Sequence, residues 1–164
     1  MLTHQPVMAE AVVAAWLTDP GGRYVDATFG RGGHAQALLT KLGAWGRLLV
    51  LDRDPDAVAV AETLAKTDVR CTALRGAFGQ LGTLVQTQAW QGQVQGILLD
   101  LGVSSPQLDA AERGFSFMRD GPLDMRMDPS AGEPVSAWLA RVDEPTLTQT
   151  LWNYGEERQA RRIA

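Results

Sequence analysis

The chain has 164 residues, of which 45% are apolar and 21% charged, with a formal net charge of −4. This composition is typical of a globular protein with a core and excludes a disordered chain. The negative charge argues against a protein that coats nucleic acid through phosphate contacts, although it is compatible with a local basic face. No stretch approaches the roughly 20 apolar residues of a membrane helix, and residues 1–10 lack a signal-peptide pattern, so we expect a cytoplasmic protein.

Helix-like and strand-like segments alternate over the first hundred residues, beginning with an amphipathic helix at 5–17. Short apolar runs then predict strands, and segments with helical periodicity lie between them. We expect strands at 24–29, 48–51, 69–74 and 97–101 and helices at 33–42, 55–67 and 80–90. Because this order implies right-handed crossovers, the pattern predicts an α/β fold with a parallel sheet, which binds ligands at the carboxyl ends of its strands.

The pattern changes after Leu101. Residues 102–134 are rich in Gly, Pro, Ser and Asp, and helical segments follow at about 135–142, 145–153 and 156–164, with no further strand. A boundary near residue 108 is expected, which gives parts 1–108 and 109–164. The last helix has no C-terminal cap, and a four-stranded sheet would leave its fourth strand with an exposed edge. We therefore expect the natural chain to continue past its last residue.

The most informative segment is VDATFGRGGHA at 25–35, where a predicted strand leads through glycines into a predicted helix. Gly30, Gly32 and Gly33 allow a tight turn and a close approach of the backbone to a ligand. The helix N-terminus offers free N–H groups. Asp52, at the end of the second strand, is placed to accept both hydroxyls of a ribose. Together these features predict an adenosine-type cofactor, whereas the glycines alone would fit a plain βα turn.

Two cofactors compete for this loop. Gly30, Gly32 and Ala35 fit the dinucleotide fingerprint. However, Asp26 lies four residues before Gly30, as in the first methyltransferase motif, with Thr28 in place of its first glycine. An acid there suits the amino end of the methionine moiety of S-adenosylmethionine and would repel a pyrophosphate. We favour S-adenosylmethionine, with a dinucleotide-dependent oxidoreductase as the alternative.

Metal chemistry is not expected. Cys71 is the single cysteine, so no internal disulfide forms, and its predicted place is in the core. His34 has no second His or Cys at ligand spacing. We expect it either to contact the cofactor through its backbone or to be solvated.

The fourth predicted strand carries Asp100 near its end, beside the glycine loop. An exocyclic base amine is a poor nucleophile until an acceptor holds its N–H and aligns it, and alignment supplies on the order of 7–11 kcal/mol in well-oriented systems. Asp100 is therefore the candidate catalytic acceptor, which also receives the departing proton. Two alternatives remain: Asp100 caps the following turn, or it serves the cofactor. Phe115 and Phe117 fit either base stacking or a core.

These residues resemble the bacterial RsmH (MraW) family, the small-subunit rRNA cytosine-N4 methyltransferases. The matching segments span nearly the whole chain: HQPVM at 4–8, DATFGRGGHA at 26–35, LDRDPDA at 51–57, GAF at 76–78, ILLDLGVSSPQLD at 97–109, RGFSFMRDGPLDMRMD at 113–128 and YGEERQARRIA at 154–164.

The resemblance implies a Rossmann-like class I methyltransferase sheet with strand order 3-2-1-4, incomplete here, followed by part of a mostly helical insert domain. It implies methyl transfer to N4 of a cytidine in the decoding region of 16S rRNA, within the small ribosomal subunit. The implied cofactor contacts are Gly32, Gly33, His34, Asp52, Phe78, Asp100 and Gln107, with Phe78 against adenine. Because chains of the family are considerably longer, we expect this one to bind cofactor weakly or not at all unless its sheet is completed.

A third hypothesis is a non-catalytic RNA-binding module. Its phosphate contacts would be the arginines at 113, 119, 126, 158, 161 and 162. Acidic residues lie among them, so an ion-paired surface is the competing interpretation.

Overall fold

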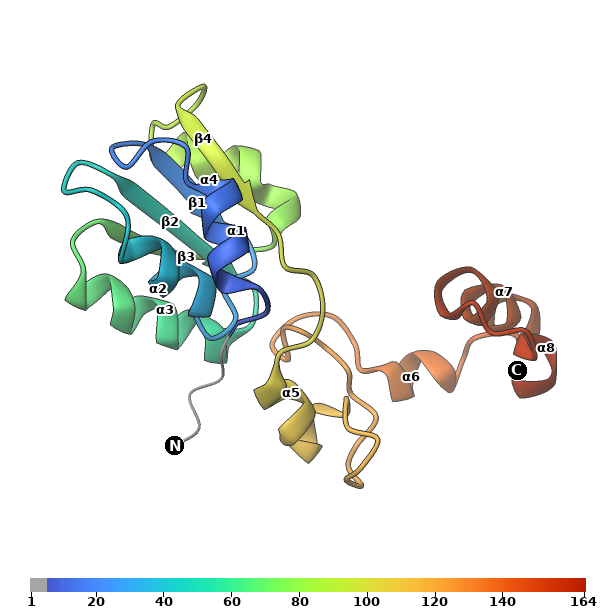
Figure 1. The fold of residues 1–164 in the computed structure, drawn as a ribbon. Helices are drawn as coiled ribbons and strands as arrows, with labels where there is room; N and C mark the ends of the chain where they lie inside the picture. Colours follow the sequence, from blue (N-terminus) through green and yellow to red (C-terminus); the bar gives the residue numbers. More distant parts are fainter. Residues whose placement is uncertain (1–5) are drawn as a thin grey trace. The chain divides into compact units, whose positions relative to one another are not determined.

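The computed structural model describes residues 6–164 and divides the chain into two compact units, Met1–Ser104 and Ser105–Ala164 (Figure 1). Each unit is described separately below. No helix among the described residues is long and apolar enough to cross a membrane.

The first unit is built on a parallel four-stranded sheet with the order β3-β2-β1-β4. Its strands are β1 (Arg23–Asp26), β2 (Arg47–Asp52), β3 (Cys71–Arg75) and β4 (Val94–Leu98). β1 lies between β2 and β4, with Asp26 opposite Val50 on one side and Leu98 on the other. The predicted Rossmann-like sheet and its strand order are confirmed.

Helices cover both faces of this sheet. They are α1 (Ala9–Trp16), α2 (Gly33–Leu39), α3 (Pro55–Thr67) and α4 (Leu81–Thr87), with a 3-10 helix η1 (Phe78–Gln80) before α4. Leu48 and Val50 of β2 join a core cluster with α1, α2 and α3, whereas Leu49 and Leu51 join a second cluster with α4. Successive strand residues point to opposite faces, so a strand covered on both sides is apolar throughout. Cys71 lies in the first cluster and is buried, as predicted.

Two element boundaries differ from the predictions in ways that matter for the site. The first helix begins at Ala9, because Met8 takes a left-handed conformation (φ 52°) that interrupts the helix; residue 5 lies outside the described residues. The fourth strand is Val94–Leu98, not 97–101. It ends at Leu98 because its partner β1 ends at Asp26, directly opposite.

The helix predicted at 55–67 has the bounds of α3, and the remaining elements of the first unit were predicted at the right places with shifted ends. Here β1 ends before Phe29, α2 ends at Leu39, and a 3-10 turn precedes the helix expected at 80–90.

The second unit contains short helices and long loops. Its elements are α5 (Ser105–Asp109), the 3-10 helix η2 (Ala111–Arg113), α6 (Val135–Leu139), α7 (Glu144–Gly155) and α8 (Ala160–Ile163). The last three correspond to the predicted helical segments, whereas α5 falls within the stretch predicted to be irregular. The described part of this unit has no strand, which agrees with the prediction.

Candidate active site

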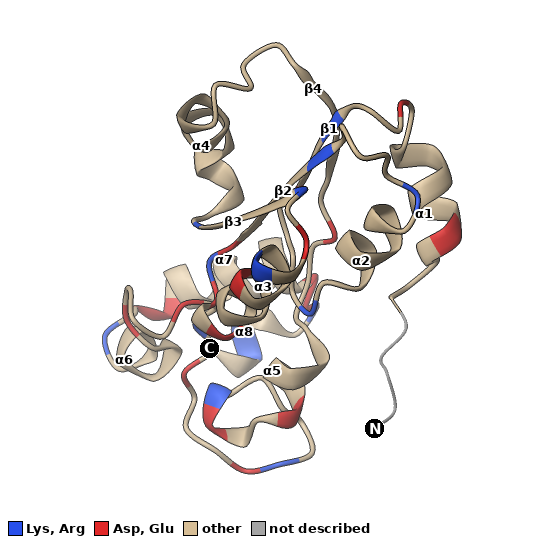
Figure 2. Cartoon of the chain, turned by 90° about the vertical axis from the view of Figure 1, so that its left-hand side faces the viewer, with Lys and Arg blue, Asp and Glu red and all other residues tan. Residues whose placement is uncertain are grey.

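Three carboxylates come from neighbouring strands of the first unit. Asp26 ends β1, Asp52 ends β2, and Asp100 follows β4 by two residues. Because parallel strands end at the same edge of a sheet, these side chains gather there. In Figure 2, acidic positions lie where β1 and β2 end, while basic positions lie where they begin. Both Asp52 and Asp100 act electrostatically on Asp26 and raise its pKa.

Asp26 is the buried member of this group, with 1% of its surface exposed. Its pKa is raised from 3.8 to about 7, mainly because burial disfavours the charged form and also because the charges of Asp52 and Asp100 lie nearby. The backbone N–H of Thr28, which donates to Oδ1 at 3.1 Å, acts in the opposite direction and lowers the pKa. No Lys, Arg or His of residues 6–164 forms an ion pair with Asp26. A ligand that brought a positive charge to this carboxylate would therefore relieve an unfavourable burial.

Asp52 is directed into the glycine loop. Its Oδ2 accepts a hydrogen bond from the N–H of Gly30 at 2.8 Å, and its Oδ1 accepts one from Asp54 at 2.9 Å. These bonds fix the carboxylate, while each oxygen keeps a second lone pair. Asp52 can therefore accept hydroxyl groups of a ligand without a change of position.

Two positions of the glycine loop favour glycine because of their backbone conformation. Gly30 and Gly32 have positive φ angles of 55° and 77°. At Gly32 a Cβ atom would also lie 2.5 Å from Cζ of Phe29, which is closer than packed atoms approach. At Gly33 it would lie 2.8 Å from Cγ of Pro6. Gly30 is different, because a Cβ atom there would have its nearest neighbour 4.0 Å away, so space remains beside it for a ligand.

His34 is buried, which corrects the expectation of a solvated side chain. Only 9% of the side chain is exposed, since the residue lies on the inner face of α2 with Ala35 and Leu38. Its Nε2 lies 3.5 Å from Oδ2 of Asp100. Its Nδ1 is buried without a hydrogen-bond partner among the described residues.

Asp100 is the exposed member of the cluster, with 59% of its side chain accessible. The sequence placed it inside a strand, but β4 ends at Leu98, and Asp100 is held instead by Thr28, whose hydroxyl accepts a hydrogen bond from its backbone N–H at 2.7 Å. Sequence reasoning noted Thr28 only as a replacement for glycine. The structure shows it connected to both acids, since its N–H also binds Asp26.

The two remaining predicted contacts lie apart from the cluster in the chain. Phe78 begins η1 just after β3, and its ring is half exposed, so it can still pack against a ligand. Gln107 belongs to α5 in the second unit, where it is buried and its Nε2 donates to Sδ of Met127 at 3.4 Å. The cluster that the structure brings together thus contains Asp26, the glycine loop with His34, Asp52 and Asp100.

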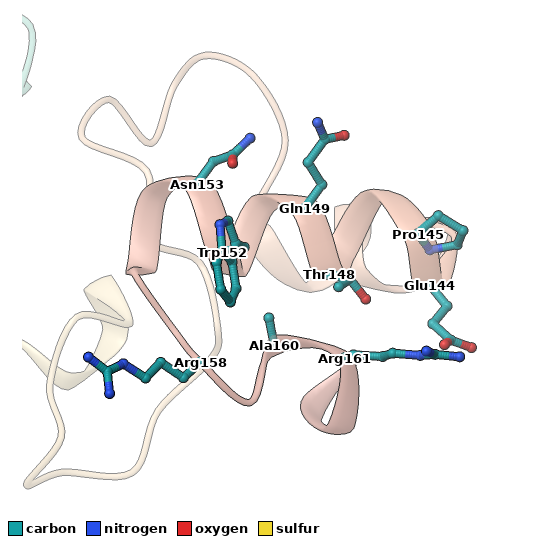
Figure 3. Close-up of a pocket in the computed structure, with 9 residues that line it drawn as sticks. All are labelled: Glu144, Pro145, Thr148, Gln149, Trp152, Asn153, Arg158, Ala160 and Arg161. Atoms are coloured by element: carbon teal, nitrogen blue, oxygen red, sulfur yellow. The ribbon is translucent and has the colours of Figure 1, made fainter.

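A separate hollow lies in the second unit between α7 and α8 (Figure 3). None of the predicted site residues lines it. Its lining residues include Trp152 and Glu144 of α7 and Arg161 of α8, while the guanidinium group of Arg158, also a lining residue, points away from the others.

The six arginines proposed as phosphate contacts differ in their burial and in the partners that they contact. Arg113 is buried and donates to the carbonyl oxygens of Arg126 and Met127. Arg126 pairs with Asp124 at 2.6 Å, and Arg119 donates to a backbone carbonyl. Half of the set therefore has structural partners inside the second unit.

Comparison with known proteins matches nearly the whole chain to one family. The model of the MraW methylase family matches residues 1–164. The chain is 55% identical over 161 residues to the Ribosomal RNA small subunit methyltransferase H of Stenotrophomonas maltophilia (strain K279a), covering 98% of this chain and 49% of that protein. It is 52% identical over 163 residues to the protein of the same name from Xylella fastidiosa (strain M12), covering 99% and 51%.

The chain thus spans about half the length of the curated relatives it matches. Among solved structures, a putative rRNA-methylase from Clostridium thermocellum is 22% identical, with a TM-score of 0.40 over 50% of this chain and 46% of that one.

Proposed function

The chain belongs to the MraW methylase family, and from this premise we propose that it acts in methyl transfer from S-adenosylmethionine to small-subunit rRNA. The proposed acceptor is the exocyclic N4 of a cytidine in the decoding region of 16S rRNA. The names of the relatives support the rRNA substrate class. A substrate within the small ribosomal subunit would place the reaction in the cytoplasm.

The observation that carries the cofactor proposal is the pair of acids around the glycine loop. Asp26 is a buried carboxyl group with a pKa raised to about 7 and no cationic partner among the described residues. The ammonium and sulfonium groups of S-adenosylmethionine would supply the missing positive charge. A dinucleotide would instead bring its pyrophosphate toward this acid, which disfavours the oxidoreductase alternative.

The other proposed contacts follow from the same placement. Asp52, held by Gly30 and Asp54, would accept the ribose hydroxyls. Gly30, which has open space beside it, would let the backbone approach the cofactor, and Gly32 and Gly33 would shape the turn and add backbone contacts. Phe78 would pack against adenine, and Gln107 would add a polar contact. We propose no metal site.

The residue proposed for catalysis is Asp100. The bound cofactor supplies an electrophilic methyl group. Asp100 presents an exposed carboxylate on a backbone fixed by Thr28, so one oxygen can accept the N–H of the target amine and orient its nitrogen. As the N–CH3 bond forms and the methyl–sulfur bond breaks, the amine must lose a proton, and this carboxylate is placed to receive it.

Calorimetric titration of the protein at its natural length tests the cofactor proposal. S-adenosylmethionine should bind, and NAD should not. Asp26→Asn, which keeps the shape of the side chain but removes its charge, should weaken the binding at least about tenfold, in line with the loss of one buried charge contact. Glu62→Gln, on the exposed face of α3, is the matched control and should bind like the wild type. Tight binding of NAD, or an Asp26→Asn variant with unchanged affinity, would contradict the proposal.

Methylation of isolated small subunits, followed by mass spectrometry of the digested rRNA, tests the reaction. A new N4-methylated cytidine is expected with the wild type. A methyl group found on a ring carbon or on a ribose would exclude an amine acceptor and with it the proposed role of Asp100.

A further inference from the structure

His34 is a buried side chain that faces an exposed one. Its imidazole is 9% exposed, whereas the carboxylate of Asp100 is 59% exposed, and the two meet with Nε2 3.5 Å from Oδ2. His34 therefore stands behind the acid proposed to meet the substrate, on the protein side of it.

The environment of the imidazole indicates where its proton lies. A carboxylate can only accept, so the contact with Asp100 is attractive when Nε2 carries the hydrogen. Nδ1 faces no acceptor among residues 6–164, so a hydrogen there would gain nothing. A hydrogen on Nε2, which lies 3.5 Å from Oδ2 of Asp100, is therefore the favoured arrangement.

Asp100 needs such a restraint because it belongs to no strand or helix. Thr28 fixes only its backbone, through the 2.7 Å hydrogen bond from the N–H of Asp100. The carboxylate could still rotate about its side-chain bonds. A donor at Oδ2 would select one orientation and leave Oδ1 free, and hydrogen bonds in an active site commonly shorten when the substrate is bound.

We propose that His34 is a positioning residue, whose Nε2–H holds Oδ2 of Asp100 so that Oδ1 receives the amine of the target base. This inference rests on the proposed function. It differs from a cofactor contact made by the backbone of His34, since the side chain acts here and acts through Asp100.

Two substitutions separate this role from packing. His34→Gln can still donate an N–H toward Asp100, whereas His34→Leu has a similar size but no donor. In the protein at its natural length, with small subunits as substrate, His34→Leu should lower kcat about 10- to 100-fold, because small misplacements of an aligned group have effects of this size. The KM for S-adenosylmethionine and its calorimetric Kd should change less than about threefold, and His34→Gln should recover most of kcat.

Several results would overturn the inference: full activity of His34→Leu, equal impairment of His34→Gln and His34→Leu, or a loss of cofactor affinity that parallels the loss of kcat. If the wild type methylates no small subunit, the proposed function itself fails. An active wild type with an unaffected His34→Leu variant overturns only the role of His34.

A double-mutant cycle with His34→Ala, which also lacks a donor, keeps the test valid if His34→Leu folds poorly. His34→Ala should lower kcat in the wild-type background but have no further effect on residual activity in an Asp100→Ala background, because the group on which His34 acts is absent there. An equal effect of His34→Ala in both backgrounds would contradict a role exerted through Asp100.

Discussion

The two units of the chain differ in what holds them together. In the first, residues 48–51 of strand β2 are fully buried between two apolar clusters, and the carboxylates of the candidate site lie at or just past the ends of such strands. In the second, α7 buries no residue, and the loops are held by polar contacts such as those of Arg113 and Arg126. The candidate site thus lies in the unit that has an apolar core, where packing fixes the positions of side chains.

The largest expected effect is a pH-dependent loss of stability in the first unit, caused by the buried carboxyl group of Asp26. The pKa of Asp26 is raised from 3.8 to about 7, so the native state holds this proton between about pH 4 and pH 7 while the unfolded chain releases it. The free energy of unfolding should therefore fall as pH rises through this window, by up to about 4 kcal/mol.

Asp26→Asn should remove this pH dependence and be more stable than the wild type above pH 7, although it binds cofactor poorly. Urea denaturation between pH 4 and pH 8 measures both curves, with Glu62→Gln as control. Parallel curves for the wild type and Asp26→Asn would show that Asp26 keeps an ordinary pKa.

The next prediction compares one leucine in each unit. Leu49 is fully buried in β2, whereas Leu147 of α7 is only half buried. Leu49→Ala should lower the free energy of unfolding of its unit by about 3 kcal/mol, because it leaves a cavity. Leu147→Ala should cost less than about 1 kcal/mol. Amide hydrogen exchange, followed separately in the two units, checks this, and equal losses would mean that the second unit has a core of its own.

The smallest expected effect is the loss of stability on replacing a buried arginine of the second unit. Arg113 is buried and donates to the carbonyls of Arg126 and Met127. Arg113→Met keeps roughly the length of the side chain but leaves two partly buried carbonyl acceptors without donors, which should destabilise this loop by about 1–2 kcal/mol. Arg158→Met, at an exposed position in the same unit, should change stability by less than about 0.5 kcal/mol. Faster hydrogen exchange over residues 123–128 in the first variant only is the expected result.

The sheet and the glycine loop could be predicted from sequence because their signals are local. β2 is an unbroken apolar run because both of its faces are covered, and the spacing of Asp26, Gly30 and Gly32 is readable without a structure. The end of β4 could not be predicted, since leucines continue past it at 99 and 101 and the strand stops where its partner β1 stops. That limit is set by a segment about seventy residues earlier in the chain.

Other features of the site were missed for similar reasons. The burial of His34 depends on which face of α2 turns inward. Histidine occurs both in protein cores and on protein surfaces, so the residue type did not decide the question. α5 has only five residues, too few to show helical periodicity. The bond from Asp100 to Thr28 joins residues 72 positions apart, so no local pattern could have indicated it.

Thr28 has a consequence that follows from its two bonds. Its backbone N–H donates a hydrogen bond to Asp26, the acid proposed to meet the cofactor. Its hydroxyl accepts one from the backbone N–H of Asp100, the acid proposed to meet the base. Thr28 therefore connects the carboxylate of Asp26 to the backbone of Asp100, while the carboxylate of Asp100 stays free to rotate. A displacement of this one threonine would shift the proposed cofactor contact and the backbone of the proposed catalytic acid together.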